Sequence, residues 1–190
     1  MNFNKHFNLK DKHAFLGASK YTWLNYDAEK LKESYISNQA RYRGTRLHEL
    51  ASELINLGVK LPSTHKTLNM FVNDAIGYRM ESEQVLYYSD NCFGTADAIG
   101  YKERTKKLRI HDLKTGTTPA SMKQLYIYTA LFCLEYAIDP HQLDIELRIY
   151  QFDDVQIENP ETTDILLIMQ KICDFDRLIE TMKEEDATWN

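Results

Sequence analysis

The chain has 190 residues, of which 43% are hydrophobic and 27% are charged. This length and composition suffice for a folded domain with its own core, and they exclude a disordered segment. The formal net charge of −5 excludes a basic coat over the whole surface, but it allows a local basic patch that binds nucleic acid.

The cysteines and the N-terminal residues bear on the cellular compartment. The three cysteines are Cys92, Cys133 and Cys173, and no two of them form a C-x-x-C pair. This spacing supports neither a zinc site nor an iron–sulfur cluster, and the odd number suits a reducing compartment. The segment MNFNKHFNLKDKH contains no apolar signal sequence, and no stretch approaches the length of an apolar membrane span. We therefore expect a cytoplasmic protein that does not cross a membrane.

Helical periodicity dominates residues 1–80. The sequence predicts a helix at 19–39, with Ser19 as its N-cap, and another at 65–80. Between them, residues 43–58 carry leucines at three- and four-residue intervals and end in a glycine, which is typical of a helix C-terminus. We expect these helices to form the N-terminal part of the fold.

Strand-like segments follow in residues 81–152. An antiparallel meander is predicted from three short segments rich in β-branched and aromatic residues, at 83–89, 93–101 and 107–115. A buried helix is predicted at 119–137, with Pro119 in its first turn. Residues 143–152 then alternate in the manner of a strand.

The remaining residues, 153–190, are predicted to contain a short strand at VQIEN and an amphipathic helix at 161–186. No internal repeat or linker interrupts the sequence. The order of elements favours a single domain over 1–190 of the α/β (α+β) class, in which helices flank a mixed central sheet.

Two carboxylates and a lysine are the strongest chemical feature. Asp97 lies within the predicted strand 93–101, and Asp112 and Lys114 lie two residues apart at the end of the next strand, so they share one face. Carboxylate oxygens bind hard divalent cations, and a neighbouring lysine can orient water or offset charge on a phosphate. An ordinary ion pair at a sheet edge is the alternative for so short a motif.

Other polar residues occur at positions that suit the same site. His48 lies at the border of the buried face of the helix at 43–58, although a structural histidine is usual there. Gln124 and Tyr128 lie four residues apart and share a helical face, which is also consistent with a polar seam. Residues 101–123 form a basic island in an acidic protein, and its alternative interpretation is a solvated hairpin. Its cations are Lys102, Arg104, Lys106, Lys107, Arg109, Lys114 and Lys123.

Four motifs occur in a fixed order between residues 40 and 150: G-x-x-x-H (44–48), G-x-A-D-A (94–98), D-L-K-T-G (112–116) and Q-x-x-x-Y (124–128). This set resembles the PD-(D/E)XK nuclease superfamily. Within it, the set is most similar to the RecB-like branch, which includes lambda-type and CRISPR-associated exonucleases. Each motif is weak alone, and the ordered set is specific.

The resemblance implies a role for each matching residue. His48, Asp97, Asp112 and the backbone carbonyl of Leu113 would bind Mg²⁺ or Mn²⁺. Lys114 would be the catalytic lysine, and Gln124 and Tyr128 would position the DNA backbone or the lysine.

Further residues are implied less directly. Glu83 is an additional carboxylate for a second metal ion, and Glu53 is a weaker candidate. Ser19 and Trp23 resemble a small motif that contacts substrate in some family members. The expected nucleic-acid-binding residues are therefore Ser19, Trp23, Arg43, Lys102, Arg104 and Lys123.

The chain departs from the family pattern in two respects. Asp112 stands where glutamate is at least as common, and both bind metals. The four cysteines that hold an iron–sulfur cluster in many CRISPR-associated relatives are absent. The resemblance thus implies a cluster-free deoxyribonuclease of the phage recombination type, an exonuclease in recombination or repair. Its partners would be DNA and a recombination protein, and a homo-oligomer is compatible with the sequence.

Two other functions fit parts of the sequence. A non-catalytic DNA- or protein-binding subunit of the same fold is one, although every candidate catalytic residue is present. The second is a serine β-lactamase-like enzyme, because S-x-x-K (63–66), S-D-N (89–91) and K-T-G (114–116) occur in the order of that family. Only about two dozen residues separate those motifs, which is too few for the large helical region of that fold.

Overall fold

The computed structural model describes residue 7 and residues 14–187 and divides the chain into two compact units, 1–45 and 46–190. The first unit contains a 3₁₀ helix, η2 (Ala18–Asn25), and the first part of helix α1 (Ala28–Leu57). Two predictions were wrong here. Ser19 does not cap an α-helix, and the helices predicted at 19–39 and 43–58 are not separated at residues 40–42.

The physical reason lies in the sequence around the predicted break. Asp27 caps α1, because its carboxylate accepts a hydrogen bond of 2.7 Å from the backbone N–H of Lys30. Arginines and an alanine favour helix at residues 40–46, and a single glycine, Gly44, costs only about 1 kcal/mol relative to alanine. The helix therefore continues through the position at which we predicted an interruption.

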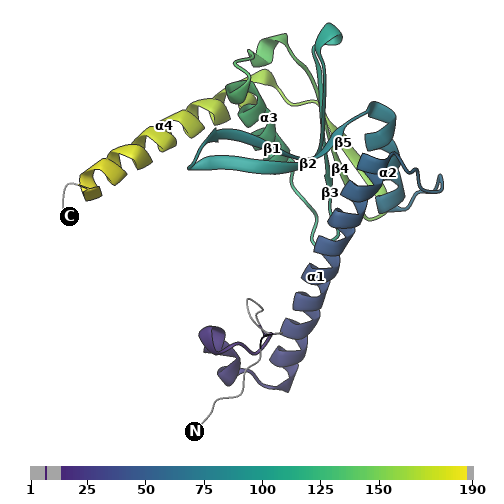
Figure 1. The fold of residues 1–190 in the computed structure, drawn as a ribbon, viewed down its shortest axis with the longest axis vertical. Coiled ribbons are helices and arrows are strands. Elements are labelled where there is room, and N and C mark those ends of the chain that lie inside the picture. The colour runs from purple at the N-terminus through teal and green to yellow at the C-terminus, as the bar shows by residue number, and fades with distance from the viewer. Residues whose placement is uncertain (1–6, 8–13, 188–190) are drawn as a thin grey trace. The chain divides into compact units, whose positions relative to one another are not determined.

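A five-stranded mixed sheet forms the centre of the second unit (Figure 1). Its strands lie side by side in chain order: β1 (Glu81–Ser89), β2 (Cys92–Lys102), β3 (Lys107–Leu113), β4 (Asp144–Gln151) and β5 (Asp154–Glu158). All neighbours are antiparallel except β3 and β4, which run parallel. The structure thus confirms a mixed α/β fold and the predicted meander.

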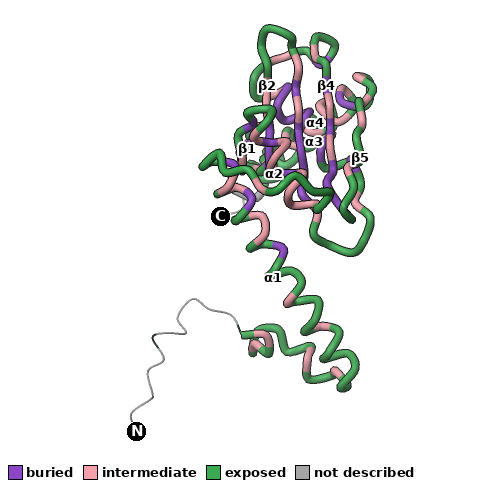
Figure 2. The backbone as a smooth tube through the Cα atoms, turned by 90° about the vertical axis from the view of Figure 1, so that its right-hand side faces the viewer, coloured by how far each residue is buried: buried purple, intermediate pink, exposed green. Residues whose placement is uncertain are grey.

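Helices cover both faces of this sheet. The end of α1 and helix α2 (Thr67–Tyr78) pack on one face, and α3 (Lys123–Glu135) and α4 (Thr162–Ala187) lie on the other. A short 3₁₀ turn, η3 (Glu103–Thr105), connects β2 to β3, and another, η4 (Pro140–Gln142), lies between α3 and β4. Buried residues concentrate on the strands and on the helix sides that face them (Figure 2).

The parallel step from β3 to β4 determines where the polar motifs meet. Parallel neighbours require a crossover connection, and α3 supplies it. The loop from Lys114 to Met122 leads from the end of β3 to the start of α3 at Lys123, so Pro119 lies before the helix and not in its first turn as predicted. The start of α3 therefore lies beside the end of β3, where Gln124 contacts Lys114.

The alternation of side chains between the two faces of the sheet is interrupted at Asp97 on strand β2. Ala96 packs in the core beneath α3, whereas Ala98 packs in the core beneath α2. Residues two apart normally share a face of a strand, so the alternation switches between them. Across from Asp97 on β1 lies Glu83, whose φ of 52° falls in the left-handed region. This irregularity places both carboxylates at the same point of the sheet.

Among the residues described, no helix is both long enough and apolar enough to cross a membrane.

Candidate active site

The end of strand β3 buries a carboxylate beside an ammonium group. Asp112 is 1% exposed, and its Oδ1 accepts a hydrogen bond of 3.0 Å from Nζ of Lys114. Its Oδ2 lies 2.9 Å from the same nitrogen, but the geometry is not that of a hydrogen bond. Oδ2 is therefore a buried acceptor without a hydrogen-bond partner among the described residues.

Helix α3 holds the lysine from the other side. Nζ of Lys114 donates to Oε1 of Gln124 at 2.8 Å, and Nε2 of Gln124 donates to the hydroxyl of Tyr128 at 2.8 Å. The Tyr128 ring packs on strand β2 at Gly94, where an added Cβ would come within 2.9 Å of the ring. Gln124 thus contacts Lys114, Tyr128 contacts Gln124, and a larger residue at position 94 would displace the Tyr128 ring.

A second cluster lies on the neighbouring strands. Nδ1 of His48 lies 3.3 Å from Oδ2 of Asp97, and one ligand atom from each of His48, Glu83 and Asp97 lies within 4.8 Å of the others. Oδ2 of Asp97 also accepts a hydrogen bond of 2.8 Å from the backbone N–H of Leu113. This bond ties the cluster to the strand that carries Asp112.

The electrostatics of the two clusters are coupled. Burial raises the pKa of Asp112, and the charge of Asp97 raises it further, while Lys114 opposes the shift. Burial and the charge of Asp97 also raise the pKa of Glu83. The hydrogen bond to Asp97 raises the pKa of His48. The charge of Asp97 thus disfavours the ionised forms of both Asp112 and Glu83, a condition that a bound cation would relieve.

The donor set fits a hard divalent cation. Carboxylate oxygens with one imidazole nitrogen suit Mg²⁺ or Mn²⁺, and the group contains no thiolate that would favour a softer metal. The buried Oδ2 of Asp112 lacks a hydrogen-bond donor in the described part of the chain, and an ion could complete its coordination. Asp112 itself lies outside the group of three, so a single ion could not bind all four side chains as they stand.

Two further predicted ligands differ in position. The Leu113 backbone N–H binds Asp97, whereas its side chain packs in the core beneath α2, and the role of its carbonyl stays a prediction. Glu53 is exposed on α1 and is not in the metal-ligand group.

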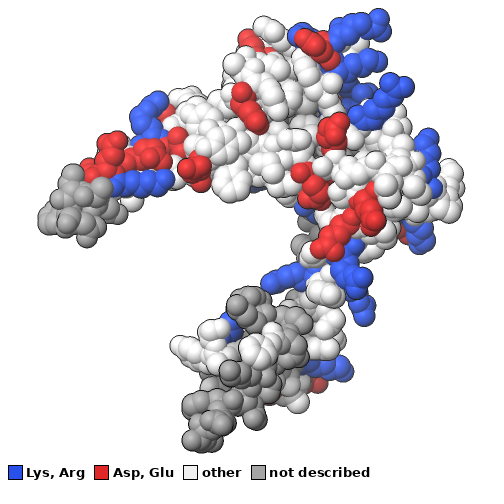
Figure 3. All heavy atoms as spheres, in the orientation of Figure 1, with Lys and Arg blue, Asp and Glu red and all other residues white. Residues whose placement is uncertain are grey.

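The predicted DNA-binding residues are dispersed. Lys102 and Arg104 lie at the tip of the β2–β3 hairpin, at the end of the sheet away from Asp112, where Lys and Arg side chains gather (Figure 3). Lys123 begins α3 next to Gln124. Ser19, Trp23 and Arg43 belong to the first unit, where the indole N–H of Trp23 donates to the carbonyl of Gly17 at 3.0 Å.

Residues of the S-D-N (89–91) and S-x-x-K (63–66) sequences take part in contacts that hold the fold together. Ser89 and Asn91 donate hydrogen bonds to Asp176 on α4, which ties the β1–β2 turn to that helix. Lys66 pairs with Asp153 at 2.6 Å. Ser89, Asn91 and Lys66 thus have roles within the fold.

Sequence reasoning missed the residues that fix the loop after Lys114. The side chain of Gln151, 8% exposed, donates to the carbonyls of Gly116 and Thr118 and accepts from the N–H of Ala120. A glutamine at the end of a strand has no distinctive sequence signal. Only the parallel pairing of β3 and β4 places it beside this loop.

No protein-family model matches the chain, and no match was found among curated proteins or solved structures.

Proposed function

We propose that the protein is a Mg²⁺- or Mn²⁺-dependent deoxyribonuclease with a PD-(D/E)XK core. The observation that carries the proposal is the position of Lys114, whose Nζ is held between the buried Asp112 and Gln124. An ordinary surface ion pair would need neither a buried carboxylate nor a third residue that fixes the lysine. The ordered motifs noted in the sequence support the same assignment.

The proposal assigns each residue of the site a separate role. Asp97 and His48 would hold a cation together with Asp112 or with Glu83, and two cations would engage all four side chains. A bound cation supplies a Lewis acid that polarises the phosphate and lowers the pKa of water. Lys114 would then orient the attacking water or donate to a non-bridging phosphate oxygen, which stabilises developing negative charge.

The residues on α3 act through the lysine. Gln124 accepts from Nζ and so limits the positions that Lys114 can take, and Tyr128 binds the amide of Gln124. Both are positioning residues. DNA as the substrate, and action from chain ends in recombination or repair, follow from the resemblance to lambda-type exonucleases.

The test is digestion of end-labelled linear duplex, single-stranded and circular DNA with Mg²⁺ or Mn²⁺. We expect the wild type to degrade linear DNA, and Lys114→Gln and Asp112→Asn each to lower the rate by about 10²- to 10³-fold or more. Lys60→Gln, at an exposed lysine outside the site, is the matched control and should keep full activity.

The alternative is a non-catalytic DNA- or protein-binding subunit with the same fold. It would be favoured if the wild type cut none of these substrates with either ion and still bound DNA. Cleavage of circular DNA at the same rate as linear DNA would instead indicate an endonuclease.

A further inference from the structure

The turn between strands β4 and β5 holds an aromatic residue in an unusual conformation. Gln151 pairs with Asp154, so the loop contains only Phe152 and Asp153. Their φ values are 56° and 57°, and two left-handed residues make the type of turn that favours Asn-Gly. Aspartate tolerates this region, but a bulky phenylalanine is strained there.

The strain is not offset by burial of the side chain. Phe152 is 58% exposed, so its ring contributes little to the core. A strained backbone that persists with an exposed apolar side chain suggests a role outside folding.

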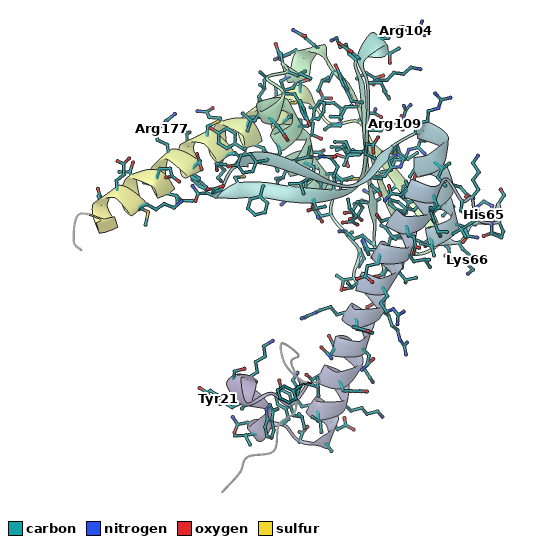
Figure 4. The ribbon with its side chains drawn as sticks, viewed as in Figure 1. Tyr21, His65, Lys66, Arg104, Arg109 and Arg177 are labelled. Atoms are coloured by element: carbon teal, nitrogen blue, oxygen red, sulfur yellow. The ribbon has the colours of Figure 1, made fainter. Side chains whose placement is uncertain are left out.

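Hydrogen bonds on both sides hold this turn in place. Asp153 accepts from the backbone N–H and the hydroxyl of Thr67 at 3.0 and 3.1 Å and pairs with Lys66 at the start of α2 (Figure 4). The Thr67 hydroxyl lies 2.8 Å from the N–H of Asp153. On the other side, Gln151 binds the loop that follows Lys114. The position of Phe152 is therefore fixed before any ligand binds.

Phe152 borders a cavity that reaches the candidate active site at Lys114. The cavity measures about 380 Å³ and is lined by Phe152, Leu68 and Leu113, with Thr115, Thr117 and Lys114 at its polar side. Lys114 thus belongs both to this cavity and to the catalytic cluster. A ligand in the cavity would place an apolar, planar group against Phe152 and a phosphate near Lys114.

We propose that Phe152 is the base-stacking residue of a nucleotide subsite that holds the nucleotide next to the scissile phosphate. Stacking on an aromatic ring tolerates every base, because each base offers a π face. The inference rests on the proposed function, since it names DNA as the ligand and Lys114 as the shared residue.

A variant that fits the turn separates this role from a structural one. Asparagine suits the left-handed region, so Phe152→Asn relieves strain, and we expect its melting temperature to rise by about 2–4 °C. The same variant should bind a labelled oligonucleotide about tenfold to hundredfold more weakly in EDTA, where hydrolysis cannot occur. Phe152→Trp should keep the affinity, because the larger ring still stacks.

Further measurements locate the effect. A 2-aminopurine placed along the oligonucleotide should be quenched at one position by the wild type, and Phe152→Asn should abolish that quenching. In cleavage assays the variant should raise KM with little change in kcat. Phe175→Asn, at another exposed phenylalanine on the remote helix α4, is the matched control and should bind and cleave as the wild type does.

The outcomes distinguish the two proposals. The subsite proposal would be overturned if Phe152→Asn left affinity, quenching and KM unchanged, or if its melting temperature fell. Neither result would contradict the proposed nuclease activity. Weakened binding by this variant, with a wild type that never cleaves, would keep the subsite and overturn the nuclease. A wild type that binds no DNA would overturn both.

Discussion

Carboxylates and cations lie at both ends of strand β3, but the pKa of the carboxyl group is shifted in opposite directions at the two ends. At the start, Glu146 on β4 accepts hydrogen bonds from Arg109 at 3.1 Å and from Arg148 at 3.0 Å, and it lies 3.3 Å from Lys107. Burial opposes ionisation of Glu146, but the three cations outweigh it and lower its pKa. At the end of the strand, Asp112 has one cation, and its pKa is raised.

This difference separates a structural ion cluster from a candidate site. Glu146 has three cationic partners, and two of these also pair with other carboxylates, Lys107 with Asp144 and Arg148 with Asp74. Aromatic contacts also support this cluster, because Arg109 lies 4.3 Å from the centre of the Tyr78 ring. The cluster around Asp112 has more carboxylates than cations and leaves one buried oxygen without a hydrogen bond. Carboxylates whose charge is matched by cations of the protein indicate a structural role. Buried carboxylates whose charge is not matched indicate a site for a bound ligand.

The largest expected effect is on stability at the first end. Glu146→Gln removes the carboxylate that Lys107, Arg109 and Arg148 share, and among the described residues it leaves Arg109 without a carboxylate partner, so it should lower the free energy of unfolding by about 3 kcal/mol. Asp112→Asn should change it by less than about 1 kcal/mol without metal, because the folded state already disfavours the ionised carboxylate. Urea denaturation at pH 7 in EDTA measures both. A large loss in Asp112→Asn would mean that its pair with Lys114 is structural.

The second prediction concerns the response to a cation. At a concentration of Mn²⁺ 100-fold above its dissociation constant, binding to the folded state alone should add about 2.7 kcal/mol to the stability of the wild type. Asp112→Asn and Asp97→Asn should remove most of this gain, and Glu146→Gln should retain it. Thermal denaturation with and without Mn²⁺ provides the comparison. Equal gains in all four proteins would place the ion elsewhere.

Contacts within one element could be predicted from the sequence more readily than contacts between elements. The face shared by Asp112 and Lys114 follows from strand periodicity, and that of Gln124 and Tyr128 from helix periodicity. Both patterns are local. The short distance between His48 and Asp97, 3.3 Å, joins two elements about fifty residues apart, and only the motif resemblance suggested it.

Three features of the fold were not predicted from the sequence. The interrupted alternation at Asp97 lies opposite Glu83 on β1, whose backbone is in the left-handed region. Glutamate does not favour that conformation. The turn at Phe152 lacks the Asn-Gly that identifies a two-residue hairpin. Helix α1 continues through residues 40–42, where a break was predicted, because Ala40, Arg41 and Tyr42 include no glycine or proline to end it. In each case tertiary contacts or neighbouring residues outweigh the local preference.

The smallest expected effect belongs to an exposed pair that lies outside both clusters of β3. The hydrogen bond from Lys66, with those from Thr67, lowers the pKa of Asp153 to about 2, below its ordinary value of 3.8. A carboxyl group with a lowered pKa stabilises the fold above its ordinary value and loses that contribution as the pH falls through 2. Asp153→Asn should therefore be less stable than the wild type at pH 6, and the difference should shrink between pH 4 and pH 2. Urea midpoints at pH 6, 4 and 3 measure this, with the exposed neighbour Asp154→Asn as the control. A difference that stayed constant with pH would show that the hydrogen bonds to Thr67, which asparagine can partly keep, matter more than the charge.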